Sequence, residues 1–114
     1  MAMTWTPMMD ADPSSVLWRG TVFRCKGKWP YESMVDFMLI DSYEARSGFI
    51  LMVATGRKSG ITLQALPEAC RATGNRRAVL MGWLQQEWTT WIYPDCAPLD
   101  VYFAESYPAP GAIP

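Results

Sequence analysis

The sequence contains no histidine. Histidine is the commonest general base in enzymes and the commonest zinc ligand, so its absence excludes Ser-His and Cys-His catalytic pairs and the HExxH zinc motif. The cysteines are few and widely spaced, and they form neither a C-x-x-C motif nor a disulfide framework. They are Cys25, Cys70 and Cys96, and three reduced thiols are the expected state. We therefore predict no metal site and no cofactor.

An enzyme without histidine would have to rely on carboxylates, on a cysteine or on a basic pair. The candidates are Asp36, Asp41, Glu44, the three cysteines and the pair Arg57–Lys58. Nothing in the sequence places two carboxylates at the separation that hydrolytic chemistry needs. A cysteine without a histidine partner is usually structural. We therefore expect the protein not to be an enzyme.

Long apolar runs are absent as well. None approaches the roughly 20 residues of a transmembrane helix. The N-terminal stretch MAMTWTPMMDADPSS lacks the basic and apolar regions of a signal peptide. These absences predict a cytoplasmic protein that binds no membrane. With 114 residues, of which 50% are hydrophobic, the chain is long and apolar enough for one packed domain.

Basic residues are missing from residue 78 onward, whereas acidic residues continue. The acidic residues of this part are Glu87, Asp95, Asp100 and Glu105. This asymmetry predicts an acidic surface offered to a basic partner, with ordinary solvated charge as the alternative interpretation. Residues 18–29 mix basic and aromatic side chains. The net charge of −1 and the lack of a known RNA- or DNA-binding motif nevertheless predict no nucleic-acid partner.

Five stretches are typical of β-strands, because β-branched and aromatic residues alternate in them or form short apolar runs. They are residues 16–25, 34–41, 49–55, 61–66 and 100–105. Gly20 inside the first stretch predicts a bulge or a close backbone approach. Asp36 in the second stretch lies on a mostly apolar face. It is either a partner contact or a carboxylate satisfied by a local arginine or backbone N–H.

The stretch Arg77–Tyr93 predicts one amphipathic helix, with Asn75 as its N-cap and Pro94 at its end. The apolar residues at helical spacing are Leu80, Leu84, Trp88 and Trp91. Large aromatic side chains dominate burial energetics, so we expect Trp88 and Trp91 in the core. Trp83 stays open between the core and a recognition face. A shorter helix is predicted at residues 67–73, where Pro67 takes the first helical position.

The fold class that follows is α+β: an antiparallel β-sheet of about five strands, with a short helix and one long Trp-rich helix packed on one face. Residues 1–14 are expected to form an irregular N-terminal arm, which Trp5 could dock onto the domain. Residues 15–107 form the single α+β domain, and residues 108–114 form an extended, Pro-rich tail. An exposed sheet edge could pair with a second copy, so a homo-oligomer stays open.

Several segments together resemble the bacterial immunity protein family numbered forty-five. They are LWRGTVFRCKGKWPYESMVDFMLID, SGFILMVATGRKSG, WLQQEWTTWIYPDC and DVYFAE. The resemblance covers roughly residues 16–107, and its most telling part is the run W-x4-W-x2-W-I-Y-P that begins at Trp83. It implies a protein that binds and neutralises a cognate toxin of a type VI secretion system in the producing cell. The implied toxin has a restriction-endonuclease-like nuclease domain.

The resemblance assigns no binding residues position by position. The charge pattern favours a contact surface made of the acidic Asp95, Asp100 and Glu105, with Tyr93 and Tyr102 as aromatic anchors. The turn at 42–48, through Tyr43 and Glu44, is the second candidate. Two mechanisms stay open: an anionic plug that mimics nucleic acid, or binding elsewhere that disturbs the assembly or shape of the toxin. A small regulatory or ligand-binding domain is the alternative function.

Overall fold

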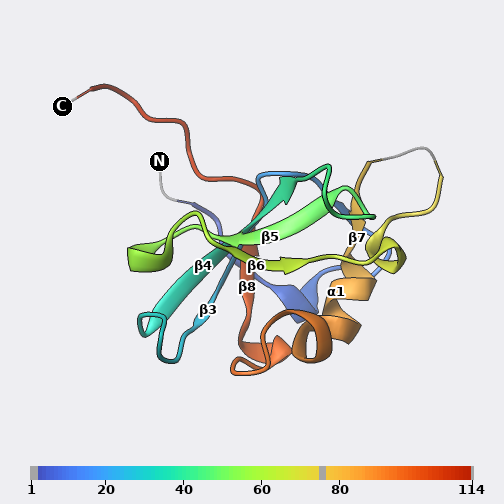
Figure 1. The fold of residues 1–114 in the computed structure, drawn as a ribbon, viewed down its shortest axis with the longest axis horizontal. Helices are drawn as coiled ribbons and strands as arrows, with labels where there is room; N and C mark the ends of the chain where they lie inside the picture. Colours follow the sequence, from blue (N-terminus) through green and yellow to red (C-terminus); the bar gives the residue numbers. More distant parts are fainter. Residues whose placement is uncertain (1–2, 75–76, 114) are drawn as a thin grey trace.

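The computed structural model describes residues 3–74 and 77–113. Its main element is a six-stranded antiparallel sheet with the order β1-β8-β3-β4-β5-β6 (Figure 1). The strands of this sheet are β1 (Thr6–Pro7), β3 (Val22–Lys26), β4 (Met34–Asp41), β5 (Phe49–Val53), β6 (Thr62–Ala65) and β8 (Tyr102–Ala104). The short strands β2 (Val16–Leu17) and β7 (Val79–Leu80) pair separately. Helix α1 (Met81–Glu87) packs against the sheet, so the α+β class is confirmed.

All five predicted strands are present, and β4 has the predicted bounds. The first predicted strand is divided into β2 and β3, because the chain turns between Trp18 and Thr21. Gly20 in this turn has a φ of +93°, which glycine adopts without a steric penalty. Its N–H donates to the Leu39 carbonyl oxygen at 2.7 Å, and a Cβ here would lie 4.0 Å from the Glu105 oxygen, so the positive φ of the turn, and not a close backbone approach, favours glycine. The last strand, β8, lies between β1 and β3.

The predicted long helix is wrong in its start. Val79 and Leu80 are extended and pair with β2, so the helical part is α1 followed by the π-turn Trp88–Ile92. The first helical N–H groups donate to the N-terminal segment: Met81 to the Ser15 oxygen and Gly82 to the Pro13 oxygen, both at 2.9 Å. These bonds satisfy donors that a side-chain cap would otherwise serve.

Two smaller helix predictions have different outcomes. The predicted helix at 67–73 is a single 3-10 turn, Glu68–Cys70. The predicted N-cap, Asn75, lies outside the described residues. Among the residues that the structure describes, no helix is both long and apolar enough to cross a membrane.

The core lies between the inner face of the sheet and the helical segment. Trp88 is fully buried at its centre, with its ring centroid 5.5 Å from Phe23 and 6.5 Å from Phe37. The prediction that Trp88 packs in the core is confirmed. The prediction for Trp91 is wrong, because this side chain is 41% exposed. The Tyr93 N–H donates to the Trp88 oxygen, an i→i+5 bond that widens the turn and rotates Trp91 out of the apolar stripe.

The N-terminal segment differs from the expected irregular arm. Thr6 and Pro7 pair with β8, and Met8 is fully buried, with its N–H donating to the Val101 oxygen at 2.8 Å. The ring of Trp5 lies under the Arg24 guanidinium at 4.2 Å, so this segment does dock onto the sheet. Residues 108–113 are exposed and carry no regular structure, and Figure 1 shows this tail leaving the sheet on the side opposite α1.

Candidate partner-binding surfaces

Asp36, which the sequence predicted on a mostly apolar face, is buried, and other side chains donate hydrogen bonds to both of its carboxylate oxygens. Asp36 is 1% exposed on the outer face of β4. Arg24 on β3 donates from Nε and Nη2 to the two carboxylate oxygens, at 2.7 and 2.9 Å. The Tyr107 hydroxyl donates to the same carboxylate at 2.5 Å. The structure therefore shows a carboxylate satisfied by a local arginine, and Asp36 is no surface contact.

This network also perturbs the groups around the carboxylate. Burial, together with the hydrogen bond to Asp36, raises the pKa of the Tyr107 hydroxyl. The hydrogen bonds to Asp36 raise the pKa of the Arg24 guanidinium. Both groups keep their protons over the physiological range, so the network holds one arrangement of charges. It ties the C-terminal segment to the outer face of the sheet.

Tyr93, predicted as an aromatic anchor, belongs to the core instead. It is 5% exposed, and its ring packs edge-on against Phe37 at 5.3 Å and Tyr31 at 5.9 Å. Its hydroxyl accepts a hydrogen bond from the Lys28 N–H at 2.9 Å. Burial raises the pKa of this hydroxyl. Because the ring is packed on both sides, Tyr93 offers no accessible surface to a partner.

The other members of the acidic set are exposed but spread along the molecule. Asp100 precedes β8 and Glu105 follows it, so an extended chain separates them by about 17 Å. That separation exceeds the screening length of about 8 Å at physiological salt. Tyr102 between them is 44% exposed. A carboxylate oxygen of Asp95 lies 3.9 Å from the Lys28 Nζ, so a cation of the protein offsets part of its charge. The set therefore forms no single concentrated anionic surface.

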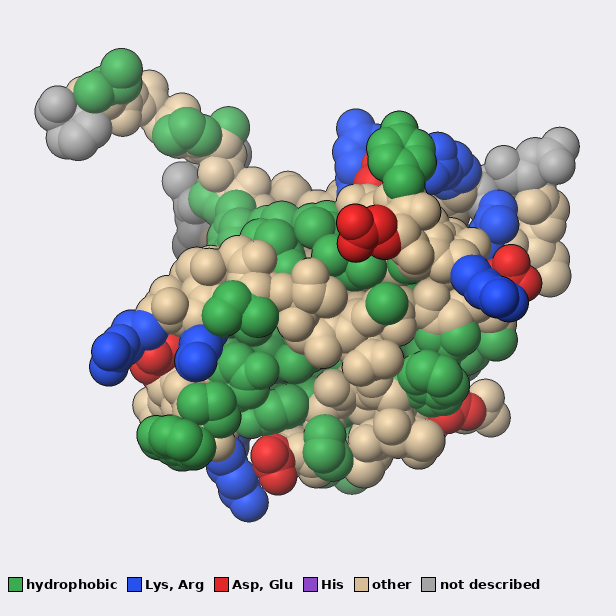
Figure 2. All heavy atoms as spheres, viewed as in Figure 1, with side chains coloured by type: hydrophobic (Ala, Val, Ile, Leu, Met, Phe, Trp, Pro, Cys, Tyr) green, Lys and Arg blue, Asp and Glu red, His purple; other side chains and the backbone are tan. Residues whose placement is uncertain are grey.

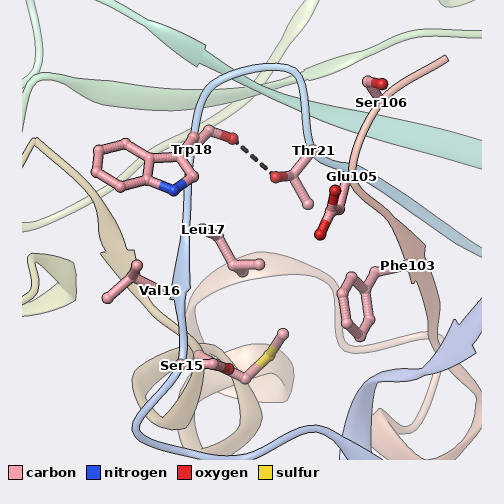
Figure 3. A pocket seen from close by; sticks show the side chains of 9 residues that line it. Ser15, Val16, Leu17, Trp18, Thr21, Phe103, Glu105 and Ser106 are labelled. Carbon is pink, nitrogen blue, oxygen red and sulfur yellow. Dashed lines mark hydrogen bonds between the residues drawn. The ribbon is translucent and has the colours of Figure 1, made fainter. Parts of the chain in front are cut away.

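Glu105 lines a hollow of about 520 Å³ between β2 and β8. Figure 3 shows Leu17 on one side of this hollow, with Phe103 and Glu105 on the other. The turn that closes it is held by the Thr21 hydroxyl, which donates to the Trp18 carbonyl oxygen at 2.7 Å. The hollow places one carboxylate beside apolar side chains, and no cation of the protein pairs with it within 4.0 Å among the described residues.

The turn between β4 and β5 carries the second predicted set. Tyr43 is 100% exposed, and Glu44 beside it is exposed too. The turn is closed by the Ser42 N–H, which donates to the Gly48 oxygen at 2.8 Å, and by the Gly48 N–H, which donates to the Ala45 oxygen at 2.9 Å. A fully exposed tyrosine therefore stands on a well-ordered hairpin end.

Four arginines surround this turn, and we call them the arginine cluster. They are Arg19, Arg46, Arg71 and Arg77. Arg46, Arg71 and Arg77 line a hollow of about 250 Å³ together with the turn. Arg19 and Arg77 line a neighbouring hollow of about 170 Å³ with Trp18 and Asp41. Figure 2 shows Lys and Arg side chains gathered at the upper right, where Figure 1 places the β4–β5 turn.

The sequence pattern missed this cluster because its members are far apart along the chain. The pairing of β2 with β7 brings the residues after Leu17 next to those before Val79, and Arg71 forms a bridge with Val79. The turn at 42–48, which connects β4 and β5, lies beside Arg71 and Arg77. The signal that could have found the cluster is this strand pairing, which the predicted long helix concealed.

A third surface is an apolar groove beside α1. Trp83 and Leu80 line a groove of about 730 Å³ with Met9 of the N-terminal segment. Trp83 also packs against the exposed Trp91, with ring centroids 6.4 Å apart. The sequence did not decide between a core and a surface position for Trp83. The structure shows it partly buried against the core, with its remaining surface lining this groove.

The cysteines lie in the interior of the protein. All three are buried and free. Burial raises the pKa of Cys25, with a further contribution from the neighbouring Cys96, and burial also raises the pKa of Cys70. The Cys25 and Cys70 thiols therefore stay protonated and are poor nucleophiles. Within residues 3–74 and 77–113, no group of three or more Cys, Asp or Glu side chains is arranged to hold a metal ion.

Comparison with known proteins agrees with the sequence resemblance. The family model described as Immunity protein 45 matches residues 9–103, which run from the 3-10 turn after β1 into β8. No curated protein and no solved structure matches the chain. The match covers most of the sequence. It includes all strands of the large sheet except β1, and it ends one residue before the end of β8. The chain therefore belongs to the Immunity protein 45 family.

Proposed function

We propose that this protein neutralises a nuclease-type toxin of a type VI secretion system by binding it in the cytoplasm of the producing cell. The observation that carries the proposal is the family match over residues 9–103, which includes most of the sheet and the whole helical segment. An immunity protein acts by binding its cognate toxin. The protein needs no catalytic centre, metal or cofactor for that task, and the buried, protonated thiols of Cys25 and Cys70 agree with a binding role.

The surface chemistry supports binding by exposed arginine and aromatic side chains. Such residues dominate the energetics of protein interfaces, because they combine a large contact area with directed hydrogen bonds. Tyr43 and Trp18 are large exposed aromatics on the side where the arginine cluster lies. A standard interface covers about 800 Å² on each partner. That area is enough to include the β4–β5 turn and both hollows beside it.

The exposed residues of the two predicted sets remain our proposed contacts. They are Tyr43 and Glu44 on the turn, and Asp95, Asp100, Tyr102 and Glu105 near β8. The turn set is the stronger proposal, because its residues lie together on one hairpin. In the β8 set, Asp100 and Glu105 are separated by more than the screening length, and Asp95 lies beside Lys28, which disfavours an anionic mimic of nucleic acid. Binding that alters the assembly or shape of the toxin is therefore the mechanism that we favour.

Co-purification and titration calorimetry test the proposal. The full chain is expressed with the toxin domain encoded beside its gene, and nuclease activity is measured against the ratio of the two proteins. We expect a tight complex of defined stoichiometry and full suppression of the nuclease at that ratio. In cells, deletion of the immunity gene should be lethal only when the toxin gene is present.

An active toxin with a folded but non-binding partner would overturn the proposal. The same outcome would favour a small regulatory or ligand-binding domain. A complex that forms while the toxin acts on a membrane or cell-wall substrate would keep the immunity function and change the toxin class.

A further inference from the structure

We infer that the arginine cluster and Tyr43 form the toxin-binding surface, and that they receive an acidic segment of the toxin rich in Asp and Glu. This inference rests on the proposed function and goes beyond it, because it names the surface and the chemistry of the partner. It also reverses the expectation from charge along the sequence, which predicted a basic partner.

The cluster concentrates positive charge at one place. Arg77 lines both hollows, so the two hollows form one continuous surface. A side chain on Gly48 would meet the Arg77 Nη2 at 3.4 Å, which places this guanidinium against the backbone of the turn. All four arginines are exposed, as is the Tyr43 ring.

Within the described part of the chain, the arginine cluster has no ion-pair partner. Ion pairs within 4.0 Å join Arg24 to Asp36 and Lys28 to Asp95, and neither pair involves the cluster. Asp41 shares a hollow with Arg19 and Arg77, yet the described residues place no carboxylate oxygen within 4.0 Å of any of the four guanidinium groups. Several unpaired guanidinium groups repel one another, and carboxylates of a partner would relieve that repulsion.

The supporting elements are ordered, which favours binding. Arg46 lies on a turn that backbone hydrogen bonds close, and Arg71 forms a β-bridge with Val79. The Ser47 hydroxyl further fixes the end of the turn, because it accepts a hydrogen bond from the Phe49 N–H at 3.1 Å. A preordered surface loses little conformational entropy when it binds. The guanidinium fork then pairs with a carboxylate through two parallel hydrogen bonds.

Local acidic residues distinguish a protein partner from a nucleic acid. Asp41 lines a hollow with Arg19 and Arg77, and the exposed Glu44 lies on the same turn as Arg46, so both carboxylates would repel a continuous phosphate backbone. A phosphate backbone also requires an extended basic track, whereas the net charge of the chain is −1. A protein segment with separated carboxylates fits a surface of mixed sign, because its own basic residues can meet Asp41 and Glu44. The fully exposed Tyr43 supplies the apolar anchor.

Charge reversal with matched controls tests the inference by titration calorimetry against the same toxin domain. We expect Arg46→Glu and Arg71→Glu each to weaken binding by about tenfold or more, and Tyr43→Ala by about tenfold. Arg46→Lys keeps the charge but loses the fork, so an intermediate loss is expected. The control is Arg57→Glu, which reverses an exposed arginine at the opposite end of β5 and should change the affinity less than about twofold. Circular dichroism checks that every variant is folded.

Each outcome is decisive. If the wild-type chain binds the toxin and the cluster variants bind equally well, the inferred surface is wrong while the immunity function stands. If Asp95→Lys, Asp100→Lys and Glu105→Lys weaken binding and the cluster variants do not, the β8 set is the contact surface. If the wild-type chain does not bind the toxin, the proposed function fails, and this inference fails with it. Fluorescence anisotropy measures whether the chain binds single- or double-stranded oligonucleotides. If the wild-type chain binds them tightly and the arginine variants do not, the cluster is a nucleic-acid surface and the inference is wrong.

Discussion

The two faces of the same sheet are stabilised in different ways. On the inner face, Phe23 and Phe37 pack against Trp88 within a cluster of buried hydrophobic side chains. On the outer face, Asp36 is buried to the same degree but is held by Arg24 and Tyr107. Asp36 and Phe37 are neighbours on β4, so one peptide step separates a hydrophobic core from a charged network. The inner face supplies most of the free energy of folding. The outer-face network holds the segments that carry Trp5 and Tyr107 against the sheet.

This difference has a physical origin. Apolar burial is non-directional and contributes about 25 cal/mol per Å² removed from water. A buried carboxylate contributes little net stability, because the cost of desolvation offsets its attraction to the arginine. It does, however, demand specific partners. Trp5 stacks on Arg24 and Tyr107 bonds to Asp36, so segments from both ends of the chain meet on this network.

Removal of the central aromatic of the inner face should have the largest effect. We expect Trp88→Ala to lower the free energy of unfolding by about 4 kcal/mol, because it deletes a large, fully buried side chain and leaves a cavity. Urea denaturation followed by circular dichroism measures this loss. Trp88→Phe is the matched control and should cost much less, since it keeps a ring and removes an indole N–H that has no partner among the described residues. Equal losses for both variants would contradict the packing explanation.

Removal of Arg24, the cation of the outer-face network, should cause the second largest loss in the free energy of unfolding. Arg24→Ala leaves the Asp36 carboxylate buried without its bidentate partner, so we expect a loss of about 2 kcal/mol. The Arg24 side chain is 40% exposed, and solvent screening keeps the loss below that of a fully buried pair. The double variant Arg24→Ala with Asp36→Ala should recover part of the loss, because no unpaired charge remains. A double variant less stable than Arg24→Ala alone would refute this account.

Removal of one hydroxyl should have a smaller effect that depends on pH. Tyr107→Phe deletes one hydrogen bond to Asp36, so we expect a loss of about 1 kcal/mol at neutral pH. The folded-state pKa of Tyr107 lies above its ordinary value of 10.0, so the unfolded chain releases this proton first as the pH rises. The contribution of Tyr107 to stability is therefore fully present below about pH 10 and falls at higher pH.

The alkaline behaviour of the variant provides the measurement. Thermal unfolding between pH 7 and pH 11 should show a steeper alkaline loss of stability in the wild-type chain than in Tyr107→Phe. Cys25, Cys70 and Tyr93 also have raised pKa values and contribute to the alkaline loss in both proteins, so only the difference reports on Tyr107. Parallel curves would mean that the folded state does not raise the pKa of the Tyr107 hydroxyl.

The sequence predicted the outer-face network only in part, and the reason is distance along the chain. Arg24 lies opposite Asp36 in a hairpin pair of neighbouring strands, which is the local arginine that strand alternation anticipates. Tyr107 reaches the same carboxylate from 71 positions away, and no pattern in a single sequence encodes that contact. The arginine cluster was missed for the same reason. The predicted helix start failed because pairing with β2 overrode the helical periodicity of Val79 and Leu80.

The smallest loss of stability is expected at Trp91, which the sequence predicted in the core and which the structure leaves partly exposed. Trp91 shares the helical spacing of Trp88, yet the π-turn leaves it 41% exposed against Trp83. Trp91→Ala should therefore cost less than about 1 kcal/mol in urea denaturation, although it removes the same side chain as Trp88→Ala. A loss as large as that of Trp88→Ala would mean that Trp91 is a core residue and that the helical stripe continues through the turn. A small loss would place Trp91 outside the core, in agreement with the wider turn that the i→i+5 bond from Tyr93 closes.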